Sequence, residues 1–253
     1  MDLGRYRIVI PARYGSSRLP GKPLLEIAGK PMLEWVYERA RRCHAAEVLI
    51  ATDDERIATL ARGFGAEVVM TAVDHQSGTD RIAEVAARRG WSNEEVVVNL
   101  QGDEPAMPIA LIEQVASLMR EWPKADMATL AAPVLNREEY FDPNAVKLVT
   151  DADGRALYFS RAPIPWYRDE LPANTLPAAR RHIGLYAYRV GALRRLAALP
   201  PAPLEIAEKL EQLRALFNDF EIRVGEAVTR PGPDVNTAED LARVSARLMM
   251  GEL

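Results

Sequence analysis

Residues 7–22, RIVIPARYGSSRLPGK, carry a short apolar run that leads directly into a basic loop with two glycines. Arg7 to Ile10 have the β-branched composition of a buried strand, and from Pro31 onward apolar residues recur at helical spacing. Strand, loop and helix in this order are typical of α/β folds with a mostly parallel sheet. Such sheets bind ligands in the loops at the carboxyl ends of their strands, so residues 12–22 are the first candidate binding site.

The alternation of strands and helically spaced segments continues through the first half of the chain. The most β-branched run, residues 96–100, is predicted to be the central strand, buried on both faces. The other elements predicted in this half are strands at 48–51 and 67–70 and helices at 54–64, 77–89 and 108–120.

After Pro123 the pattern changes, because turn-forming residues separate short strands that need not be parallel, and a proline-rich stretch occupies 163–177. The elements predicted there are strands at 127–134, 145–149, 155–159, 182–189 and 221–224 and helices at 191–199, 204–217 and 237–250. We therefore expect an α/β fold with a mixed, mostly parallel central sheet. It forms one domain over residues 1–253, with a smaller inserted lobe at about 125–200.

The composition limits the class of protein. The 253 residues include 32 lysines and arginines against 36 aspartates and glutamates, a formal net charge of −4, so the basic footprint of a nucleic-acid-binding protein is missing. The single cysteine, Cys43, excludes an internal disulfide and a cysteine-based zinc site. No apolar run approaches 18 residues and the N-terminus lacks a signal-peptide pattern, which predicts a cytoplasmic protein without membrane insertion.

The loop after the first strand concentrates positive charge. Arg13, Arg18 and Lys22 can neutralise a polyphosphate while backbone amides near Gly15 approach its oxygens; a solvated basic turn is the alternative. The loop is not a P-loop, because Lys22 is followed by Pro23 rather than by the Ser or Thr that binds magnesium.

Two carboxylates follow the predicted central strand in the segment Gln101-Gly102-Asp103-Glu104. Hard oxygen ligands at this position favour magnesium held jointly with substrate phosphates, and Asp103 is the candidate ligand. Glu104 is the weaker candidate, because adjacent side chains rarely point the same way. The alternative is an ordinary turn before the next helix.

Two other polar segments allow two interpretations each. Ser77 and Thr79 can cap the helix that they open, or hydrogen-bond a base or a sugar hydroxyl. Asp234 and Asn236 share one face if extended and can reach a metal, whereas Asn236 or Thr237 can instead cap the last helix. The three histidines lack metal-ligand spacing, and no Gly-x-Ser-x-Gly elbow is present, so hydrolytic covalent catalysis is poorly supported.

Six segments occur in an order that resembles the family of 3-deoxy-manno-octulosonate cytidylyltransferases, also called CMP-Kdo synthetases. The first is IPARYGSSRLPGKPL at residues 10–24. The others are HQSGTDR (75–81), VNLQGDEP (98–105), YFSRAPIP (158–165), HIGLYAYR (182–189) and LEQLR (210–214). The resemblance therefore spans nearly the whole chain.

This resemblance implies a GT-A-like nucleotidyltransferase fold and a homodimer. The implied reaction transfers CMP from CTP to the anomeric 2-hydroxyl of Kdo and releases pyrophosphate, the sugar-activating step of lipopolysaccharide biosynthesis. Direct in-line attack with Mg²⁺ as cofactor is expected, because phosphoryl-type transfer needs positioning and charge neutralisation more than a covalent nucleophile.

The resemblance also implies a role for each matching residue. The triphosphate would be held by Arg13, Ser17, Arg18 and Lys22, with Lys22, Arg18 and Asp103 acting in catalysis. The cytidine and the active site would be framed by Ala12, Ser77, Gly78 and Gln101. The Kdo pocket would be lined by Gln101, Arg161, His182, Tyr186 and Glu211, with Arg161 as partner of the sugar carboxylate.

One departure from the family concerns the second metal ligand. The family has Val-Asp-Thr-Pro-Glu-Asp where this chain has Val-Asn-Thr-Ala-Glu-Asp, so Asn236 stands in place of an aspartate. We expect Asp234, two residues earlier and on the same face, to supply the missing charge. The alternatives to Kdo activation are a cytidylyltransferase for another acidic sugar, such as an amino-Kdo or a nonulosonic acid, and a catalytically silent CTP-binding protein.

Overall fold

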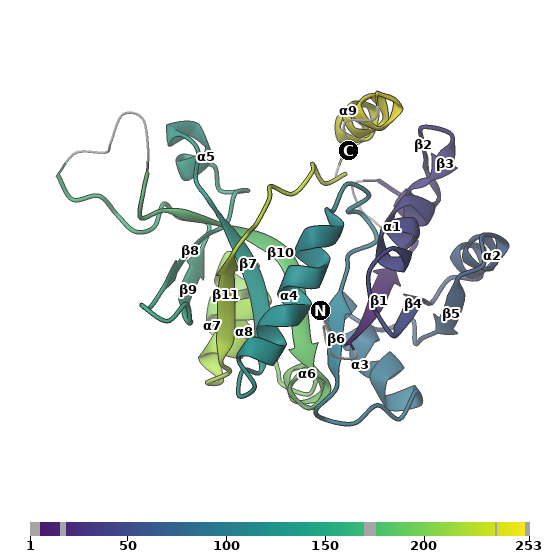
Figure 1. Cartoon of the computed structure of the whole chain (residues 1–253), viewed down its shortest axis with the longest axis horizontal. Helices are drawn as coiled ribbons and strands as arrows, with labels where there is room; N and C mark the ends of the chain where they lie inside the picture. Colours follow the sequence, from purple (N-terminus) through teal and green to yellow (C-terminus); the bar gives the residue numbers. More distant parts are fainter. Residues whose placement is uncertain (1–5, 16–18, 170–175, 236, 251–253) are drawn as a thin grey trace.

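A mixed sheet organises the residues that the computed structural model describes, which are 6–15, 19–169, 176–235 and 237–250. Its main strand order is β11-β7-β10-β6-β1-β4-β5 (Figure 1). The first strand, β1 (Tyr6–Ala12), lies between β4 (Glu47–Thr52) and β6 (Val96–Asn99), and β5 (Glu67–Met70) forms the edge beyond β4. All of these pairs are parallel, as the sequence predicts.

The second half of the chain adds the antiparallel part. The long strand β10 (Arg180–Arg189) runs antiparallel to β6 and to β7 (Met127–Pro133), and β11 (Ile222–Glu226) pairs with β7 in parallel. A hairpin of β8 (Lys147–Thr150) and β9 (Ala156–Ser160) joins the sheet through β10. The predicted mixed, mostly parallel sheet is therefore confirmed.

Helices cover both faces of this sheet. Ile8 and Ile10 of β1 pack in one core with residues of α1 and α4, whereas Val9 packs in a second core with α3 and α6, because side chains alternate along a strand. The helices are η1 (Lys22–Leu24), α1 (Met32–Arg41), α2 (Glu55–Gly63), α3 (Gly78–Arg88), α4 (Ile109–Glu121), α5 (Arg137–Phe141), α6 (Val190–Ala197), α7 (Pro203–Glu208), α8 (Gln212–Phe217) and α9 (Ala238–Met249).

The single helix expected at 204–217 is wrong. The chain breaks there into α7 and α8, because Lys209 adopts a left-handed conformation with φ 55° at the C-terminus of α7. The break lets Arg214 of α8 fold back onto Glu205 of α7 in a two-bond ion pair at 2.6 and 2.9 Å. Helical periodicity does not reveal a break as short as residues 209–211.

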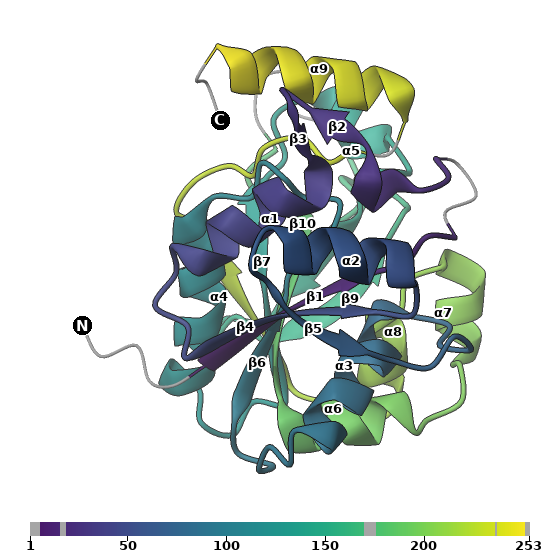
Figure 2. The same cartoon turned by 90° about the vertical axis from the view of Figure 1, so that its right-hand side faces the viewer.

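A short hairpin that the periodicity does not predict supports the last helix. Its strands are β2 (Glu26–Ile27) and β3 (Lys30–Pro31), and α9 lies across it (Figure 2). The Ala28 amide donates to Ser245 Oγ at 3.0 Å, and Ile27 packs with Val244 in a small separate core. The end of the chain is thus tied to the segment that follows the basic loop.

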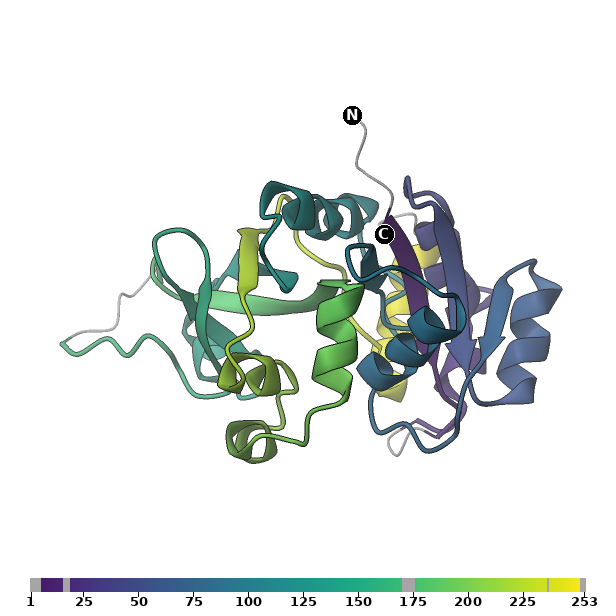
Figure 3. The same cartoon turned by 90° about the horizontal axis from the view of Figure 1, so that it is seen from below.

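The segments at about residues 135–169 and 176–180 lie at the opposite end of the molecule from residues 45–70 (Figure 3). They include α5 and the β8–β9 hairpin, and they fall within the range expected for the inserted lobe. None of the helices in the described part of the chain combines the length and the apolar composition that a bilayer crossing requires.

Candidate active site

The loops at the carboxyl ends of β1 and β6 enclose a cavity of about 250 Å³. Its lining includes most residues predicted to bind a nucleotide, namely Ala12, Arg13, Lys22, Ser77, Gly78 and Gln101, together with Asp103. Ser17 and Arg18, predicted for the same role, lie outside the described residues. The sheet topology therefore brings three distant segments of the chain to one cavity.

Two glycines allow this close approach. A Cβ atom at Gly78 would lie 3.1 Å from the ring of Pro11, and one at Gly102 would lie 3.1 Å from the Pro11 carbonyl oxygen. Both distances are tighter than ordinary van der Waals contact. Gly78 and Gly102 thus let the α3 loop and the β6 loop both pack against the end of β1.

Lys22 and Asp103 form the charged centre of the cavity. Lys22 begins η1, its side chain is nearly buried, and its Nζ lies 2.6 Å from Asp103 Oδ2. The lysine charge is thus compensated by one carboxylate in this structure. An incoming polyphosphate would compete for the same ammonium group, which is the role predicted for Lys22.

A second acidic group lies beside Asp103. The amide of Val235 donates to the Asp103 carbonyl at 3.2 Å, which places the segment before α9 against the β6 loop. The pKa of the Asp234 carboxyl is raised by desolvation and by the nearby charge of Asp103. Two carboxylates from distant parts of the chain therefore share one electrostatic environment, as the Asp234 hypothesis requires.

Glu104 also belongs to this environment. Its side chain is buried, its Oε2 has no hydrogen-bond partner, and burial followed by the charges of Asp234 and Asp103 raises its pKa well above the usual range. Within the described ranges no three acidic, histidine or cysteine side chains converge as a metal cage would require, and Asn236 lies outside them. The oxygen donors present fit a magnesium ion held by one or two carboxylates together with substrate phosphates.

The predicted sugar-binding residues line two further cavities next to the first. One, of about 860 Å³, includes Arg161, His182 and Asp234 in its lining. The other, of about 80 Å³, includes Gln101, Tyr186 and Glu211. Gln101 lines the nucleotide cavity as well as the smallest one, and Gly184 lines both sugar-side cavities, so the three spaces follow one another along the sheet.

The smallest cavity contains polar atoms that lack partners. The Tyr186 hydroxyl and Glu211 Oε1 are buried without a hydrogen bond, while Glu211 Oε2 accepts from the Thr79 hydroxyl at 3.0 Å. Buried polar atoms are normally paired, so unpaired ones facing a cavity indicate a site for a polar ligand. Their chemistry suits a molecule with several hydroxyl groups.

His182 is held in its neutral form. Its Nε2 lies 3.0 Å from the Thr129 hydroxyl, and its ring packs against Phe159 and Tyr186. Burial, with a smaller effect of Arg181, lowers the pKa of His182 to about 3. His182 can therefore offer a hydrogen bond to a ligand but not a positive charge.

Arg161 is more constrained than its predicted role suggests. Its Nε donates to the Glu208 carbonyl at 2.6 Å and one terminal nitrogen donates to the Pro143 carbonyl at 2.9 Å. These bonds tie the end of β9 to α7 and to the segment that follows α5, a structural role that the sequence does not reveal. Arg181, which no sequence motif singled out, lines the same cavity.

The hydrogen bonds show which residues cap α3 and α9. Ser77 accepts from the Asp80 amide at 3.1 Å, and Thr237 accepts from the Asp240 amide at 3.2 Å, each within a capping box. Thr79 instead donates to Glu211, which links the nucleotide side to the sugar side. Gly65 has φ +81° just beyond α2, so the segment Gly63-Phe64-Gly65 ends that helix.

Comparisons with known proteins agree with this geometry. The family model described as cytidylyltransferase matches residues 7–222. The 3-deoxy-manno-octulosonate cytidylyltransferase of Pseudomonas syringae pv. syringae is 54% identical, over 97% of this chain and 98% of its own length. The protein of the same name from Nitrosococcus oceani is 52% identical, over 98% of each chain.

Solved structures show the same likeness. A CMP:2-keto-3-deoxy-manno-octonic acid synthetase complexed with CTP superposes with a TM-score of 0.90 at 44% identity, over 99% of this chain and all of that chain. A cytidylyltransferase from Leptospira borgpetersenii serovar Hardjo-bovis superposes with a TM-score of 0.65 at 16% identity, over 99% of this chain and 90% of that chain. The second likeness shows the fold alone.

Proposed function

Because this chain belongs to the cytidylyltransferase family, and within it to the 3-deoxy-manno-octulosonate cytidylyltransferases, we propose that it transfers CMP from CTP to the anomeric 2-hydroxyl of Kdo. Pyrophosphate is the second product. The observation that carries the proposal is the shared wall of two cavities. Gln101 lines both the basic nucleotide cavity and the small cavity with unpaired polar atoms, so the two substrates can meet there.

One group of residues stabilises the charge of the triphosphate, and a second group orients the sugar. Arg13 and Lys22 bind the triphosphate and stabilise the charge that develops on the leaving pyrophosphate. Tyr186, Glu211 and neutral His182 orient the sugar by hydrogen bonds, so that its 2-hydroxyl faces the α-phosphate. Arg161 is proposed to face the sugar carboxylate from the larger cavity.

Magnesium is the proposed cofactor, with Asp103 and Asp234 as its protein ligands beside the substrate phosphates. When bound, it supplies Lewis-acid charge neutralisation at the α-phosphate and the sugar hydroxyl. The close approach of two carboxylates from separate segments supports this assignment, since a cation relieves their mutual repulsion.

The assignment predicts an order of effects for two substitutions. Asp234→Ala should weaken divalent-cation binding about tenfold or more, whereas Asn236→Ala should weaken it less, because a neutral oxygen contributes less to a cation than a carboxylate does. Binding of Mn²⁺ in the presence of CTP, measured by electron paramagnetic resonance, provides a readout besides activity. The reverse order would assign the second ligand to Asn236.

We further propose that the protein is a cytoplasmic homodimer and that its product enters lipopolysaccharide assembly. Support for a second copy comes from large exposed apolar side chains in the predicted lobe. Trp166 is 70% exposed, Leu157 56% and Leu135 53%, all within the predicted lobe. Large apolar side chains left in water are available to be buried by a partner surface.

The reaction is tested by mixing the purified protein with CTP, Mg²⁺ and Kdo and following pyrophosphate release. UTP, ATP and N-acetylneuraminate serve as substitutes for each substrate in turn. Release with CTP and Kdo alone is expected. CTP binding without release from any acidic sugar would instead identify a silent binding protein and contradict the proposal.

A further inference from the structure

One wall of the nucleotide cavity is a loop without regular secondary structure. Residues 71–77 connect β5 to α3, and His75, Gln76 and Ser77 of this loop line the cavity. Its outer side is open to solvent, with Val73 77% exposed. The loop therefore cannot depend on a hydrophobic core of its own, and something else must define its shape.

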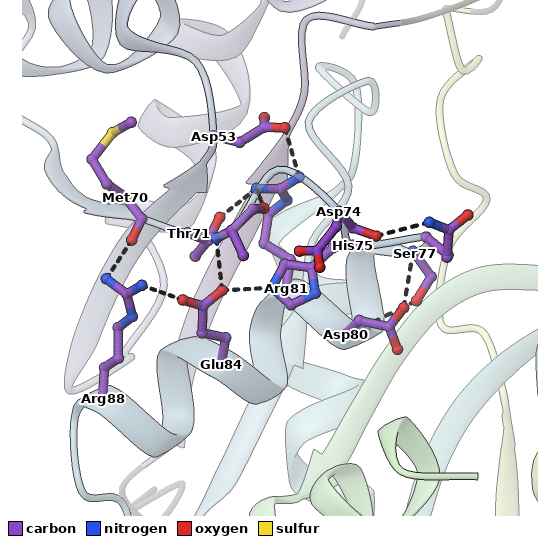
Figure 4. Close-up of polar contacts among 12 residues, drawn as sticks. Asp53, Met70, Thr71, Asp74, His75, Ser77, Asp80, Arg81, Glu84 and Arg88 are labelled. Carbon is purple, nitrogen blue, oxygen red and sulfur yellow. Dashed lines mark hydrogen bonds and ion pairs between the residues drawn. The ribbon is translucent and has the colours of Figure 1, made fainter. Parts of the chain in front are cut away.

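Glu84, in the second turn of α3, holds the loop from below (Figure 4). Its Oε2 accepts from the Ala72 amide at 2.9 Å and lies 2.5 Å from His75 Nε2. Its Oε1 pairs with Arg88, which also donates to the Met70 carbonyl at the end of β5. One carboxylate thus binds the loop at two points and the preceding strand through a third residue.

Arg81 holds the start of the same loop. Its side chain is almost fully buried, and its guanidinium pairs with Asp53 at 3.3 Å and donates to the Thr71 hydroxyl. Asp53 follows β4, so this contact joins α3, the loop and the neighbouring strand (Figure 4). Arg81 and Glu84 are three residues apart and share one face of the helix.

The charges on Glu84 are balanced before any ligand arrives. Burial opposes its ionisation, but the Ala72 amide, His75 and Arg88 together lower the pKa of Glu84 below its usual value. An unbalanced carboxylate here would repel a polyphosphate in the adjacent cavity. Because His75 and Arg88 compensate its charge, the Glu84 carboxylate can hold this loop although the loop lines an anion-binding cavity.

We propose that Glu84 and Arg81 are positioning residues that fix the 71–77 loop in its nucleotide-binding shape, Glu84 from outside the cavity lining and Arg81 from within it. The inference rests on the proposed use of this cavity for CTP. A loop that is already ordered loses less conformational freedom when the ligand binds, so the anchors should act mainly on nucleotide affinity. They should have little effect on the chemical step once CTP is bound.

The test substitutes the anchor without changing its size. Glu84→Gln should raise the KM for CTP and its calorimetric dissociation constant about tenfold, because one charge-assisted anchor is lost, and kcat should stay within about twofold. The matched control is Glu67→Gln, which removes another acid paired with an arginine at the end of α3, Arg89, but touches no part of the loop. The control should leave both constants unchanged.

A double-mutant cycle tests whether Glu84 acts through the loop. His75→Ala alone should weaken CTP binding, and the variant carrying both His75→Ala and Glu84→Gln should be weaker by clearly less than the product of the two single effects. Melting temperatures of all variants report whether each one folds. His75 is the loop partner of the pair and is half-buried, so His75→Ala remains informative if Glu84→Gln is unstable.

Three outcomes would overturn the inference: a folded Glu84→Gln protein with unchanged CTP affinity, an equal loss in Glu67→Gln, or fully independent effects in the cycle. These differ from failure of the proposed function. If the wild-type protein binds CTP but releases no pyrophosphate with Kdo, the reaction is refuted while the calorimetric comparison still tests the anchors. If the wild-type protein does not bind CTP, both are refuted.

Discussion

Lys22 is only 7% exposed, and its ammonium group lies directly against the Asp103 carboxylate. We predict that Lys22→Met lowers kcat/KM for CTP about a hundredfold or more, because a preorganised charge in a sheltered site stabilises the transition state far more than one in water. Lys30→Met is the control, since it removes a similar 2.5 Å ion pair, with Glu38, outside the cavities. Steady-state pyrophosphate release measures kcat/KM for both variants. Equal losses would contradict a special role for Lys22.

His182 gives a pH prediction whose sign follows from its environment. Its pKa is about 3 in the folded protein against an ordinary 6.5, so the unfolded chain binds a proton that the folded chain refuses. The free energy of unfolding should therefore fall as pH drops from about 6.5 toward 3, by up to about 1.4 kcal/mol per pH unit from this residue. In denaturant titrations, the free energy of unfolding of His182→Gln should fall less steeply with decreasing pH than that of the wild-type protein. The same slope in both proteins would contradict the neutral state of His182.

At the scale of elements, the break between α7 and α8 depends on the Glu205–Arg214 pair, whose side chains are 13% and 10% exposed. Arg214→Met should cost about 3 kcal/mol of stability, because it leaves a nearly buried carboxylate without its partner. Glu211 lies between the two helices, so the KM for Kdo should rise while CTP affinity is kept. Denaturant unfolding and steady-state kinetics measure the two effects.

A more exposed ion pair, between Arg195 and Asp126, supplies the control. Arg195→Met removes the pair with Asp126, in which the arginine side chain is 62% exposed, and should cost no more than about 1 kcal/mol. If Arg214→Met and Arg195→Met lower the free energy of unfolding equally, the Glu205–Arg214 ion pair does not determine the break between α7 and α8.

At the scale of the molecule, the proposed homodimer predicts a particle of twice 28.1 kDa in light scattering. Trp166→Ser should shift the protein toward monomer, because loss of a large apolar side chain removes much of the area that an interface buries. Val228→Ser, at a position 69% exposed outside the predicted lobe, should leave the mass unchanged. A monomeric wild-type protein would refute the dimer, and equal shifts would place the interface elsewhere.

Much of the fold could be predicted because it depends on local patterns. The β-branched runs at 7–10, 48–51 and 96–100 are strands, and their loops meet at one edge of the sheet as parallel topology requires. The nucleotide-side residues follow from the same rule, since Lys22, Ser77 and Gln101 belong to such loops. The family resemblance supplied the sugar-side residues, which show no local signal.

The remaining features depend on contacts between distant residues. Helical spacing runs without interruption through Lys209, whereas the break there is accompanied by the pairing of Arg214 with Glu205 and by the bond from Arg161 to the Glu208 carbonyl. Similarly, the bond between Glu84 and His75 joins a helix face to a loop that has no periodic pattern of its own.

The sequence by itself therefore determined the α/β class, the strand order along the chain and the loops that face the ligand, because hydrophobic period and turn chemistry act over a few residues. Only the tertiary structure decided that Asp234 lies beside Asp103, that His182 is neutral and that Glu84 anchors the nucleotide wall. These features arise from packing and desolvation between segments far apart in the chain, and neither quantity is encoded in local spacing.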